Sequence, residues 1–548
     1  MRIRFWLGVL SLSSFFLYAC QLPAAVQDIF LQKPTIPRGG SIALSFPDAL
    51  SSLQPWHVTS RTEEAFVTLT HAGLTRLDRQ GIPQLELMDR WSASSDGTVV
   101  TATIKPDLQW SDATPLTSAD VVYTYVSYRA FSPRTPLLRE LQRITDVVNV
   151  DAQTVVFHLN VEYAPLLTLW ALPILPMHVL GSQPIESLNL VTLATSAGPF
   201  VYTEQDATGN YHLHANPHYV RGMPFLDDVV ILPKQNQTKA IAGITDASVT
   251  VAELTENTNL RTAEATKRAA VVQNELMALV FNVRDGHLFA DPALRRALHQ
   301  ATHFEKVFDT ASIESYQNVN TMAIPGHPFA VSMPISTTTD LQPMLSDAGW
   351  EWDAPSRKFL RESEQFVVRL GIDQSNPQAM RMGESLALQW RGLGLTVDII
   401  SLDRQSYLNQ FIPPFAYDVA LVRWANGRSD SQYADTFMYD GRSGDLFDHV
   451  LMNSGMPDIR PSLNLTGYNN PQYQAAQHLA DAIYDPARRA QAEQKAIHIA
   501  LSDESIIPIA RPIHTVVWQS TIAIPSGELV LDTPWYLYGI EQWYLKAQ

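Results

Sequence analysis

The sequence predicts an α/β protein built from several domains. Residues Met380–Leu395 have a helical pattern, and two strand-like runs follow them, Thr396–Leu402 and Tyr417–Trp424. Helices that alternate with single strands are typical of α/β units. The chain has 548 residues, 46% hydrophobic and 17% charged, which is the balance of a folded globular protein. At roughly 150 residues per domain, this length predicts three to four domains.

Two strands and a helix are predicted in the N-terminal part. Ser41–Phe46 alternates as a strand does. Asp96-Gly97 predicts a hairpin turn, because glycine accepts a positive φ, and the β-branched run Val99–Ile104 follows it. The tetrapeptide Thr117–Asp120 is a capping box, so a helix is expected to begin there.

Three further helices are predicted from an Asx-Pro start. Proline is favoured at the first helical position because the amide hydrogen that it lacks has no partner there. The pairs are Asp291-Pro292, Asn470-Pro471 and Asp485-Pro486. In the second helix Leu479 and Ile483 lie four residues apart, and in the third Ala492, Ala496 and Ile499 share a face, which predicts the buried sides.

Charge and cysteine content exclude some classes of function. The formal charge is −16, whereas proteins that bind nucleic acid carry clustered basic residues, so no nucleic-acid partner is expected. Cys20 is the only cysteine, which excludes an internal disulfide framework and a zinc or redox site of the Cys-x-x-Cys type. We expect neither a resident metal nor a cofactor.

The first residues are expected to be a targeting segment. Arg2 and Arg4 precede an apolar run from Phe5 to Tyr18, which is typical of a secretory signal. About 14 residues are too few for a membrane span, which needs about 20. No later segment has 18 consecutive apolar residues, so we expect the rest of the chain to be soluble.

The end of this segment, Leu17-Tyr18-Ala19-Cys20, resembles the bacterial lipobox, whose cysteine receives a diacylglyceryl group before cleavage. Residues 1–19 are therefore expected to be a lipoprotein signal peptide, Cys20 the lipidated first mature residue, and residues 20–40 a tether. Loss of Arg2 and Arg4 gives the mature chain a charge of −18. The alternative is a free, buried Cys20 in an ordinary signal.

Familiar catalytic motifs are absent from the sequence: there is no GxSxG, P-loop, HExxH or GxGxxG. Asp227 and Asp228 are neighbours in a predicted strand and point to opposite faces, so a shared acid–base role is not expected. His212 and His214 share a face, but a metal would need further ligands, and surface histidines are favoured. A hydrolase with two facing carboxylates stays open as an alternative, because such residues need not be close in sequence.

Four blocks in order resemble the extracytoplasmic solute-binding proteins of ABC importers, in the oligopeptide/dipeptide/nickel-binding family 5. The blocks are His71–Tyr125, Gly198–Ile231, Leu279–Ala301 and Asn469–Arg511. They resemble, in turn, the family's tryptophan before a D-G hairpin and its T-A-x-D-V-V-Y helix, its G-P-Y…N-P-x-Y…P-x-L-D-x-V pattern, its F-N…R-x-A-L pattern and its C-terminal Y-x-N-P helix pair. Ala113 departs from the family, which usually has glycine there.

This resemblance implies a periplasmic-binding-protein-like two-lobe fold of type II, with the extra subdomain of the peptide-binding class, mixed sheets flanked by helices, and the ligand in the interlobe cleft. It implies lobe I at 41–60, 172–278 and 506–548, the extra subdomain at 61–171, and lobe II at 279–505. The protein would be a monomer, anchored by lipid in the periplasm or at the cell surface, that delivers peptides or peptide-like solutes to a membrane permease and is not an enzyme.

The resemblance also implies the ligand-binding residues. Candidate strand edges for a peptide are Val58–Arg61 and Trp424–Arg428, and Met277 is a candidate wall residue. The predicted ligand-binding residues are Thr59, Ser60, Arg61, Met277, Arg423, Trp424, Asn426, Arg428 and Asp430.

One departure from the family concerns the ligand. Peptide binders of this family commonly carry an aspartate three residues after the tryptophan equivalent to Trp424, and it pairs with the peptide amine. Here that position is Gly427, followed by Arg428, and a cation repels an ammonium group. Either Asp430 substitutes, or Arg423 and Arg428 receive a carboxylate or phosphate. The alternative ligands are an oligosaccharide, an opine-like acid or a metal chelate.

Overall fold

The computed structural model describes residues 36–51, 53, 58, 60–130, 141–181, 195–255, 265–311, 313, 315–324, 326–334, 340–403, 406–407, 415–425 and 465–547. Cys20, and with it the predicted signal peptide and most of the tether, lies outside these residues. Within them, no helix combines the length and the apolar character that a membrane crossing requires.

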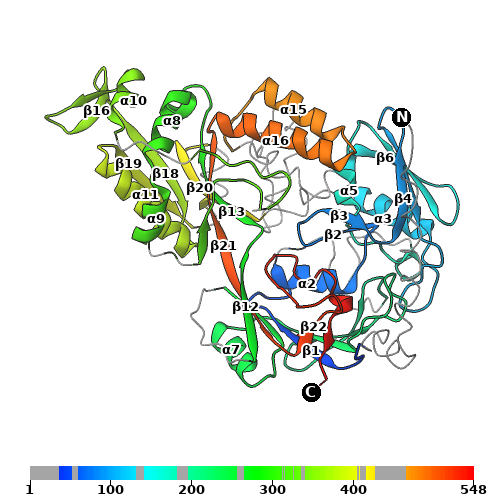
Figure 1. The fold of residues 1–548 in the computed structure, drawn as a ribbon. Coiled ribbons are helices and arrows are strands. Elements are labelled where there is room, and N and C mark those ends of the chain that lie inside the picture. Colours follow the sequence, from blue (N-terminus) through cyan, green and yellow to red (C-terminus); the bar gives the residue numbers. More distant parts are fainter. Residues whose placement is uncertain are drawn as a thin grey trace, which may run out of the picture.

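One twisted sheet runs through most of the described chain (Figure 1). Its order is β19-β18-β20-β13-β21-β11-β1-β10-β9-β8, and β12 and β14 also pair with β21. These strands are β1 (Ser41–Ser45), β8 (Phe200–Gln205), β9 (Tyr211–Ala215), β10 (Asp228–Leu232), β11 (Val251–Leu254), β12 (Thr266–Val272), β13 (Glu275–Phe281), β14 (Tyr316–Asn318), β18 (Val367–Asp373), β19 (Thr396–Leu402), β20 (Val419–Ala425) and β21 (Ile506–Gln519). The strands predicted at 41–46, 396–402 and 417–424 are confirmed.

The 14-residue strand β21 joins the two halves of this sheet. Its first part pairs with β13, and its second part pairs with β11 and β12. The chain also passes between the halves where β12 is followed by β13. Two neighbouring strand segments therefore connect the halves, a geometry that permits hinge motion.

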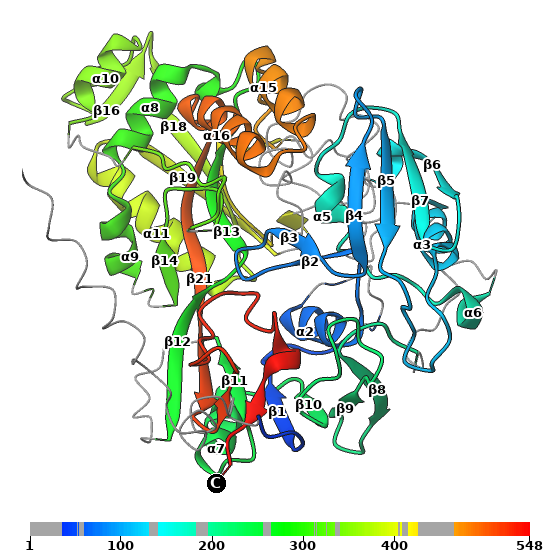
Figure 2. The same ribbon diagram turned by 45° about the vertical axis from the view of Figure 1, so that its right-hand side comes forward.

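A separate four-stranded sheet lies at one side of the molecule (Figure 2). Its order is β4-β5-β7-β6, with β4 (Met88–Ala93), β5 (Val99–Ile104), β6 (Ile144–Asn149) and β7 (Thr154–Leu159). The predicted hairpin turn is confirmed, because it joins β4 to β5 and Gly97 has a φ of 66°. Ala113 also has a positive φ, 66°, which explains why glycine suits that turn.

The predicted helix starts are confirmed. At the capping box, the Asp120 carboxylate accepts a hydrogen bond from the Thr117 amide at 2.9 Å, and α3 begins at Ser118. The α-helices of the described residues are α2 (Arg61–Thr70), α3 (Ser118–Ala130), α5 (Leu166–Leu169), α6 (Met177–Leu180), α7 (Gln237–Thr245), α8 (Pro292–Ala301), α9 (Phe304–Ala311), α10 (Gln342–Asp347), α11 (Pro377–Gly392), α15 (Pro471–Asp481) and α16 (Pro486–Ser502).

The predicted buried faces of the last two helices need correction. Leu479 is 56% exposed, so it does not belong to the packed side of α15, where Tyr473, Ala476 and Ala480 are buried. In α16 Ala496 is buried as expected, but the buried face also holds the charged pair Arg489 and Glu493. Period alone does not select the buried face of these helices, because apolar residues also lie on their other faces.

The remaining elements are short. They comprise the pairs β2 (Thr75–Leu77) with β3 (Pro83–Leu85) and β22 (Ile522–Ala523) with β23 (Tyr544–Leu545), and a small sheet of β15 (Glu351–Asp353), β16 (Lys358–Arg361) and β17 (Glu364–Gln365). Single 3₁₀ turns are η1 (Leu141–Arg143), η4 (Leu288–Ala290) and η7 (Ile540–Gln542).

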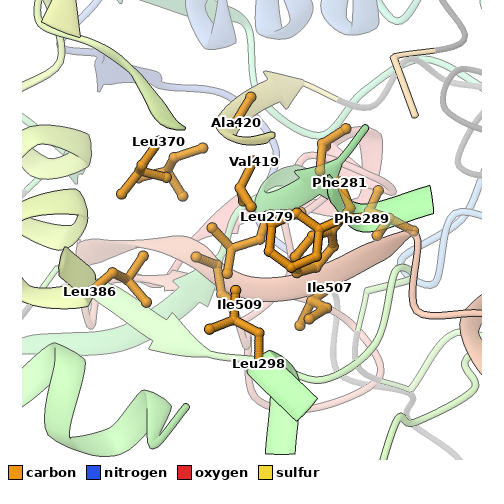
Figure 3. Close-up of a cluster of buried hydrophobic side chains, with 14 of the residues drawn as sticks. Leu279, Phe281, Phe289, Leu298, Leu370, Leu386, Val419, Ala420, Ile507 and Ile509 are labelled. Carbon is orange, nitrogen blue, oxygen red and sulfur yellow. The ribbon is translucent and has the colours of Figure 1, made fainter. Parts of the chain in front are cut away.

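Three large hydrophobic clusters divide the molecule into three bodies, which we call lobe I, lobe II and the subdomain. The lobe II cluster runs from Leu276 to Ala510 and includes the facing side chains of β13, β18, β20, β21, α8 and α11 (Figure 3). The subdomain cluster runs from Ala72 to Ala197. The lobe I cluster combines Ile42–Leu69 with residues from Phe200 to Trp543.

The lobe boundaries given above stay a prediction. The clusters favour a subdomain that begins near Ala72 instead of residue 61, because Ala65, Phe66 and Leu69 of α2 pack in the lobe I cluster. They also favour an end near Ala197 instead of residue 171, because Leu172, Leu175 and Leu180 pack in the subdomain cluster.

Gly198 lies where two of these bodies meet. A Cβ at this position would lie 2.4 Å from the carbonyl carbon of Thr70, which is backbone and cannot move aside. We expect Gly198→Ala to lower the free energy of unfolding by about 2 to 3 kcal/mol, because it overpacks the junction. Gly392→Ala is the control, since nothing lies within 4 Å of its Cβ position in α11. Denaturant unfolding of both variants tests this, and equal stabilities would contradict it.

Candidate functional site

Parallel strands in both halves of the sheet end near the junction between the halves. In lobe I, β1 is parallel to both β10 and β11, and in lobe II β18 is parallel to both β19 and β20. Ligands of open α/β sheets bind in the crevice outside the carboxyl ends of such strands. One cluster of polar side chains lies near these strand ends in each lobe.

The polar side chains in lobe I, which we call the lobe I polar cluster, are centred on Glu253, near the end of β11. Its carboxylate accepts a hydrogen bond from Tyr536 Oη at 2.9 Å and lies 2.6 Å from Nδ1 of His514 and 3.4 Å from Nε of Arg61. The Glu253 side chain is fully buried. A buried carboxylate is stable only when such partners compensate for its lost hydration.

The electrostatics of this cluster keep the carboxylate charged. Burial acts to raise the pKa of Glu253, but the Arg61 charge and the hydrogen bonds from His514 and Tyr536 lower it to about 2. The pKa of Tyr536 is raised well above its ordinary value by burial and by Glu253. At neutral pH Glu253 and Arg61 therefore form a buried ion pair, and the Glu253 carboxylate also accepts the two hydrogen bonds from His514 and Tyr536.

Arg61 reaches Glu253 because a helix begins at Arg61. The Ser60 hydroxyl accepts from the Glu63 amide at 3.2 Å, and the Glu63 carboxylate accepts from the Ser60 amide at 3.2 Å, which forms a capping box. A helix start thus takes the place of the strand edge that was predicted at Val58–Arg61, and the ligand roles of Ser60 and Arg61 stay predictions. Arg61 also pairs with Glu64 and donates to the Pro534 carbonyl at 2.6 Å, so its guanidinium is held by the protein.

The lobe II polar cluster lies at the ends of β18 and β20. Nη2 of Arg423 donates to Glu275 at 3.1 Å, and the Arg423 side chain is 46% exposed. Burial opposes the charge of Arg423, but Glu275, Tyr316 and Asp373 raise its pKa. Asp373, the last residue of β18, accepts from the Ser375 amide at 2.9 Å. This cluster combines one cation with two carboxylates and a phenol.

Strand β21 brings the two polar clusters together. Tyr316 of the lobe II polar cluster pairs with Pro512, and His514 of the lobe I polar cluster follows two residues later. Residues two apart share a face of a strand and lie about 7 Å apart. The polar clusters therefore face the same junction from opposite lobes, and this arrangement can hold a ligand that carries charges of both signs.

The other predicted site residues have varied outcomes. Met277 is fully buried in the lobe II cluster, where it packs, and its role as a wall residue stays a prediction. Trp424 pairs with Leu276 near the end of β20. Thr59, Asn426, Arg428 and Asp430 lie outside the described residues, and so does Gly427. The ligand roles of these residues stay predictions.

The two histidines of the β9 strand pair with carboxylates. His212 lies 3.2 Å from Asp206, and His214 lies 2.9 Å from Asp228. Asp227 instead accepts from the Gly40 amide at 3.0 Å. Across the part of the chain that the structure describes, no group of three or more His, Cys, Asp or Glu side chains could hold a metal ion.

Two cavities lie next to these elements. One of ≈ 90 Å³ borders the lobe I polar cluster, between α2, β2 and the segment 534–541, and Arg61, Glu64 and Arg76 line it. The other, of ≈ 330 Å³, lies between α8, α9, β14 and the start of β21, and His299, His303 and Lys306 line it. The second contacts neither polar cluster.

The fold and the paired clusters define a class of protein. Two α/β bodies joined by strand segments, an added subdomain and polar groups at the junction are the features of a type II periplasmic binding protein. The chain matches the family "Bacterial extracellular solute-binding proteins, family 5 Middle" over residues 83–445. It therefore belongs to family 5 of the extracytoplasmic solute-binding proteins, which are substrate-binding components of ABC importers.

Its relatives are binding proteins. It is 20% identical to the oligopeptide-binding protein AppA of Bacillus subtilis, over 98% of both chains. The AppA structure with a nonapeptide has a TM-score of 0.67 and covers 94% of this chain and 100% of that one, at 19% identity.

Two further structures have other ligands. NikZ of Campylobacter jejuni, in complex with Ni(L-His), has a TM-score of 0.69 at 16% identity and covers 92% of this chain and 99% of its own. AgaA of A. tumefaciens R10, in complex with agropinic acid, has a TM-score of 0.67 at 17% identity and covers 93% and 99%. These likenesses show the fold of the present chain.

Proposed function

We propose that this protein binds peptides or peptide-like solutes between its lobes, as a lipid-anchored component of an ABC importer, and delivers them to the membrane permease. The observation that carries the proposal is the pair of polar clusters at the carboxyl ends of the strands, one in each lobe, next to β21. Arg61, Glu253 and His514 stand on one side, and Arg423, Glu275 and Asp373 on the other.

The charges of the two polar clusters support a ligand with both signs. Arg423 is partly exposed and already paired with Glu275, so a carboxylate that binds Arg423 competes with that side chain. Glu275 and Asp373 in turn can receive a cation. A peptide or an amino-acid derivative carries both groups. The predicted ligand residues Trp424, Asn426, Arg428 and Asp430, together with Thr59, remain part of this proposal.

Binding would couple to closure of the lobes. Contacts to both lobes favour the closed form, and the ligand shifts the equilibrium only by the difference between its affinities for the two forms. Micromolar affinity corresponds to about −8 kcal/mol, enough to capture a solute and still release it. Lipid on Cys20 would hold the protein near the permease and raise its effective concentration there.

A non-peptide ligand is the second candidate. The structures of AgaA with agropinic acid and of NikZ with Ni(L-His) favour it, because the same fold accepts an opine-like acid and a metal chelate. The sequence also favours an acid over a free-amine peptide, because Gly427 stands where peptide binders have an aspartate and the next residue, Arg428, is a cation. An oligosaccharide remains a third ligand class to be tested.

Thermal unfolding with a set of ligands tests the proposal. We expect di- to pentapeptides to raise the melting temperature, since a ligand at 100 times its Kd stabilises the protein by about 2.7 kcal/mol. We expect Arg423→Met to reduce this stabilisation. Arg381→Met is the control, because Arg381 is exposed on α11. Stabilisation by sugars, opines or chelates but not by peptides would refute the peptide proposal and keep the binding function.

A further inference from the structure

The turn between α15 and α16 touches the subdomain. Tyr484 Oη in this turn donates to the Gly97 carbonyl at 3.1 Å, and its ring lies 5.4 Å from that of Trp91. The amide of Ala164 donates to the Asp481 carbonyl at 2.6 Å. This last bond satisfies one of the carbonyls that the end of α15 leaves without a helical partner.

The same two helices are packed on lobe II. Tyr473, Ala476, Ala496, Ile497, Ala500 and Leu501 belong to the lobe II cluster. Gln494 donates to the Pro328 carbonyl at 2.7 Å. Figures 1 and 2 both show α16 extending from lobe II toward the subdomain, on the far side from β12. The turn is therefore a contact between lobe II and the subdomain, whereas β12–β13 and β21 join lobe II to lobe I.

Two acids are buried directly behind this contact. Asp481 is 7% exposed and Glu493 is 2% exposed. The side-chain amide of Gln477 donates to both carboxylates at 3.2 Å. Nη2 of Arg489 lies 3.4 Å from the carboxylate of Glu493.

The groups around Asp481 determine its proton affinity. Burial and the charge of Glu493 raise the pKa of Asp481 to about 7, against the opposing effects of Arg143, Arg489 and the Gln477 hydrogen bond. Arg143 belongs to the subdomain, where it also stacks on Tyr163 at 4.4 Å. The carboxyl end of α15 adds to the effect, because its dipole disfavours a negative charge there.

We propose that the α15–α16 turn is a latch that holds lobe II against the subdomain, and that the lobes close with uptake of a proton by the Asp481–Glu493 pair. Separation of the bodies removes the Ala164, Trp91 and Gly97 contacts and exposes the acids to water. The inference rests on the proposed function only in that closure accompanies binding.

The sign of the pH effect follows from linkage. The structure has the turn in contact with the subdomain, which is the closed form of this proposal, and here the pKa of Asp481 is raised. In an open, hydrated form it returns toward the ordinary value of about 4, so the closed form binds more protons. Acid therefore favours closure, and this advantage is lost as the pH rises through about 7. With these values the ratio of closed to open molecules falls about tenfold between pH 6 and pH 8.

A distance measurement without ligand tests the latch. Cys20 is the only cysteine, so the Cys20→Ser chain with Val150→Cys and Leu388→Cys takes two spin labels at exposed positions, one on the subdomain and one on lobe II. We expect the population with the short distance to grow at pH 6. Asp481→Asn should hold the short distance at both pH values, whereas Glu384→Gln, an exposed acid of α11, should behave like the parent chain.

A second variant keeps the test decisive if Asp481→Asn does not fold. Tyr484→Phe removes the bond to Gly97 but no titrating acid, so it should open the lobes severalfold at each pH and retain the pH response. The latch is overturned if the distances do not change with pH, if Asp481→Asn changes as the parent does, or if Tyr484→Phe leaves the closed population unchanged. None of these outcomes depends on the ligand, so the proposed function is tested separately.

Discussion

Replacement of Arg511 by methionine is expected to lower the free energy of unfolding by about 3 to 5 kcal/mol. Arg511 is fully buried in the middle of β21. Its guanidinium donates to the carbonyls of Glu275 at 3.2 Å and Gln273 at 3.5 Å, and also to that of Met322. Methionine keeps the apolar stem of the side chain but lacks the guanidinium, so it leaves these buried carbonyls without this donor.

The effect of Arg511→Met should be specific to the junction. Gln273 and Glu275 flank the passage from β12 to β13, so loss of Arg511 loosens the segments that join the lobes. Arg90→Met is the matched control, because the Arg90 side chain is 71% exposed and should change stability by less than about 0.5 kcal/mol. Urea unfolding of both variants measures the difference, and a loss below about 1 kcal/mol for Arg511→Met would contradict the prediction.

Glu253→Gln is expected to destabilise the protein by about 3 kcal/mol at pH 7, because it leaves the mostly buried Arg61 without its most buried partner. Tyr536 and His514 also lose a charged acceptor. Urea unfolding at pH 7 measures this loss. Glu364→Gln is the control, since the Glu364 side chain is 73% exposed.

The same residue predicts how stability depends on acid. The pKa of Glu253 lies at about 2 in the folded protein, below its ordinary value of 4.5, so the unfolded chain binds the proton more tightly. The stabilisation is present above pH 4.5 and is lost as the pH falls toward 2, a total of about 3 kcal/mol. The loss between pH 5 and pH 3 should be smaller in Glu253→Gln than in the parent. An identical acid dependence in both proteins would contradict the charged state of Glu253.

The local elements of this fold could be predicted because their signals are local. Asp291, Asn470 and Asp485 each accept hydrogen bonds from amides two or three residues ahead, so an Asx-Pro pair contains the whole start of its helix. The strand at Thr396–Leu402 was also predicted with its bounds. The buried face of α15 was not, since the neighbours that cover Tyr473 and leave Leu479 in solvent come from other parts of the chain.

The candidate site was mostly missed for the same reason. Glu253 lies 261 residues from His514 and 283 from Tyr536, so no spacing in the sequence reveals their contact. One signal was present: Glu253 and Asp373 each stand at or beside the end of an apolar strand, where ligands of α/β sheets bind.

The sequence by itself determined the helix starts and the hairpin, because each depends on residues that are neighbours in the chain. Its four blocks in order also predicted the class of the protein, which the family match confirms. The lipid attachment at Cys20 stays a prediction. Only the tertiary structure decided which charges meet. Strand β21 places His514 beside Glu253 and Pro512 beside Tyr316, and the turn after α15 brings Asp481 to the subdomain. Contacts of this kind depend on how distant segments pack, and packing is a property of the whole fold.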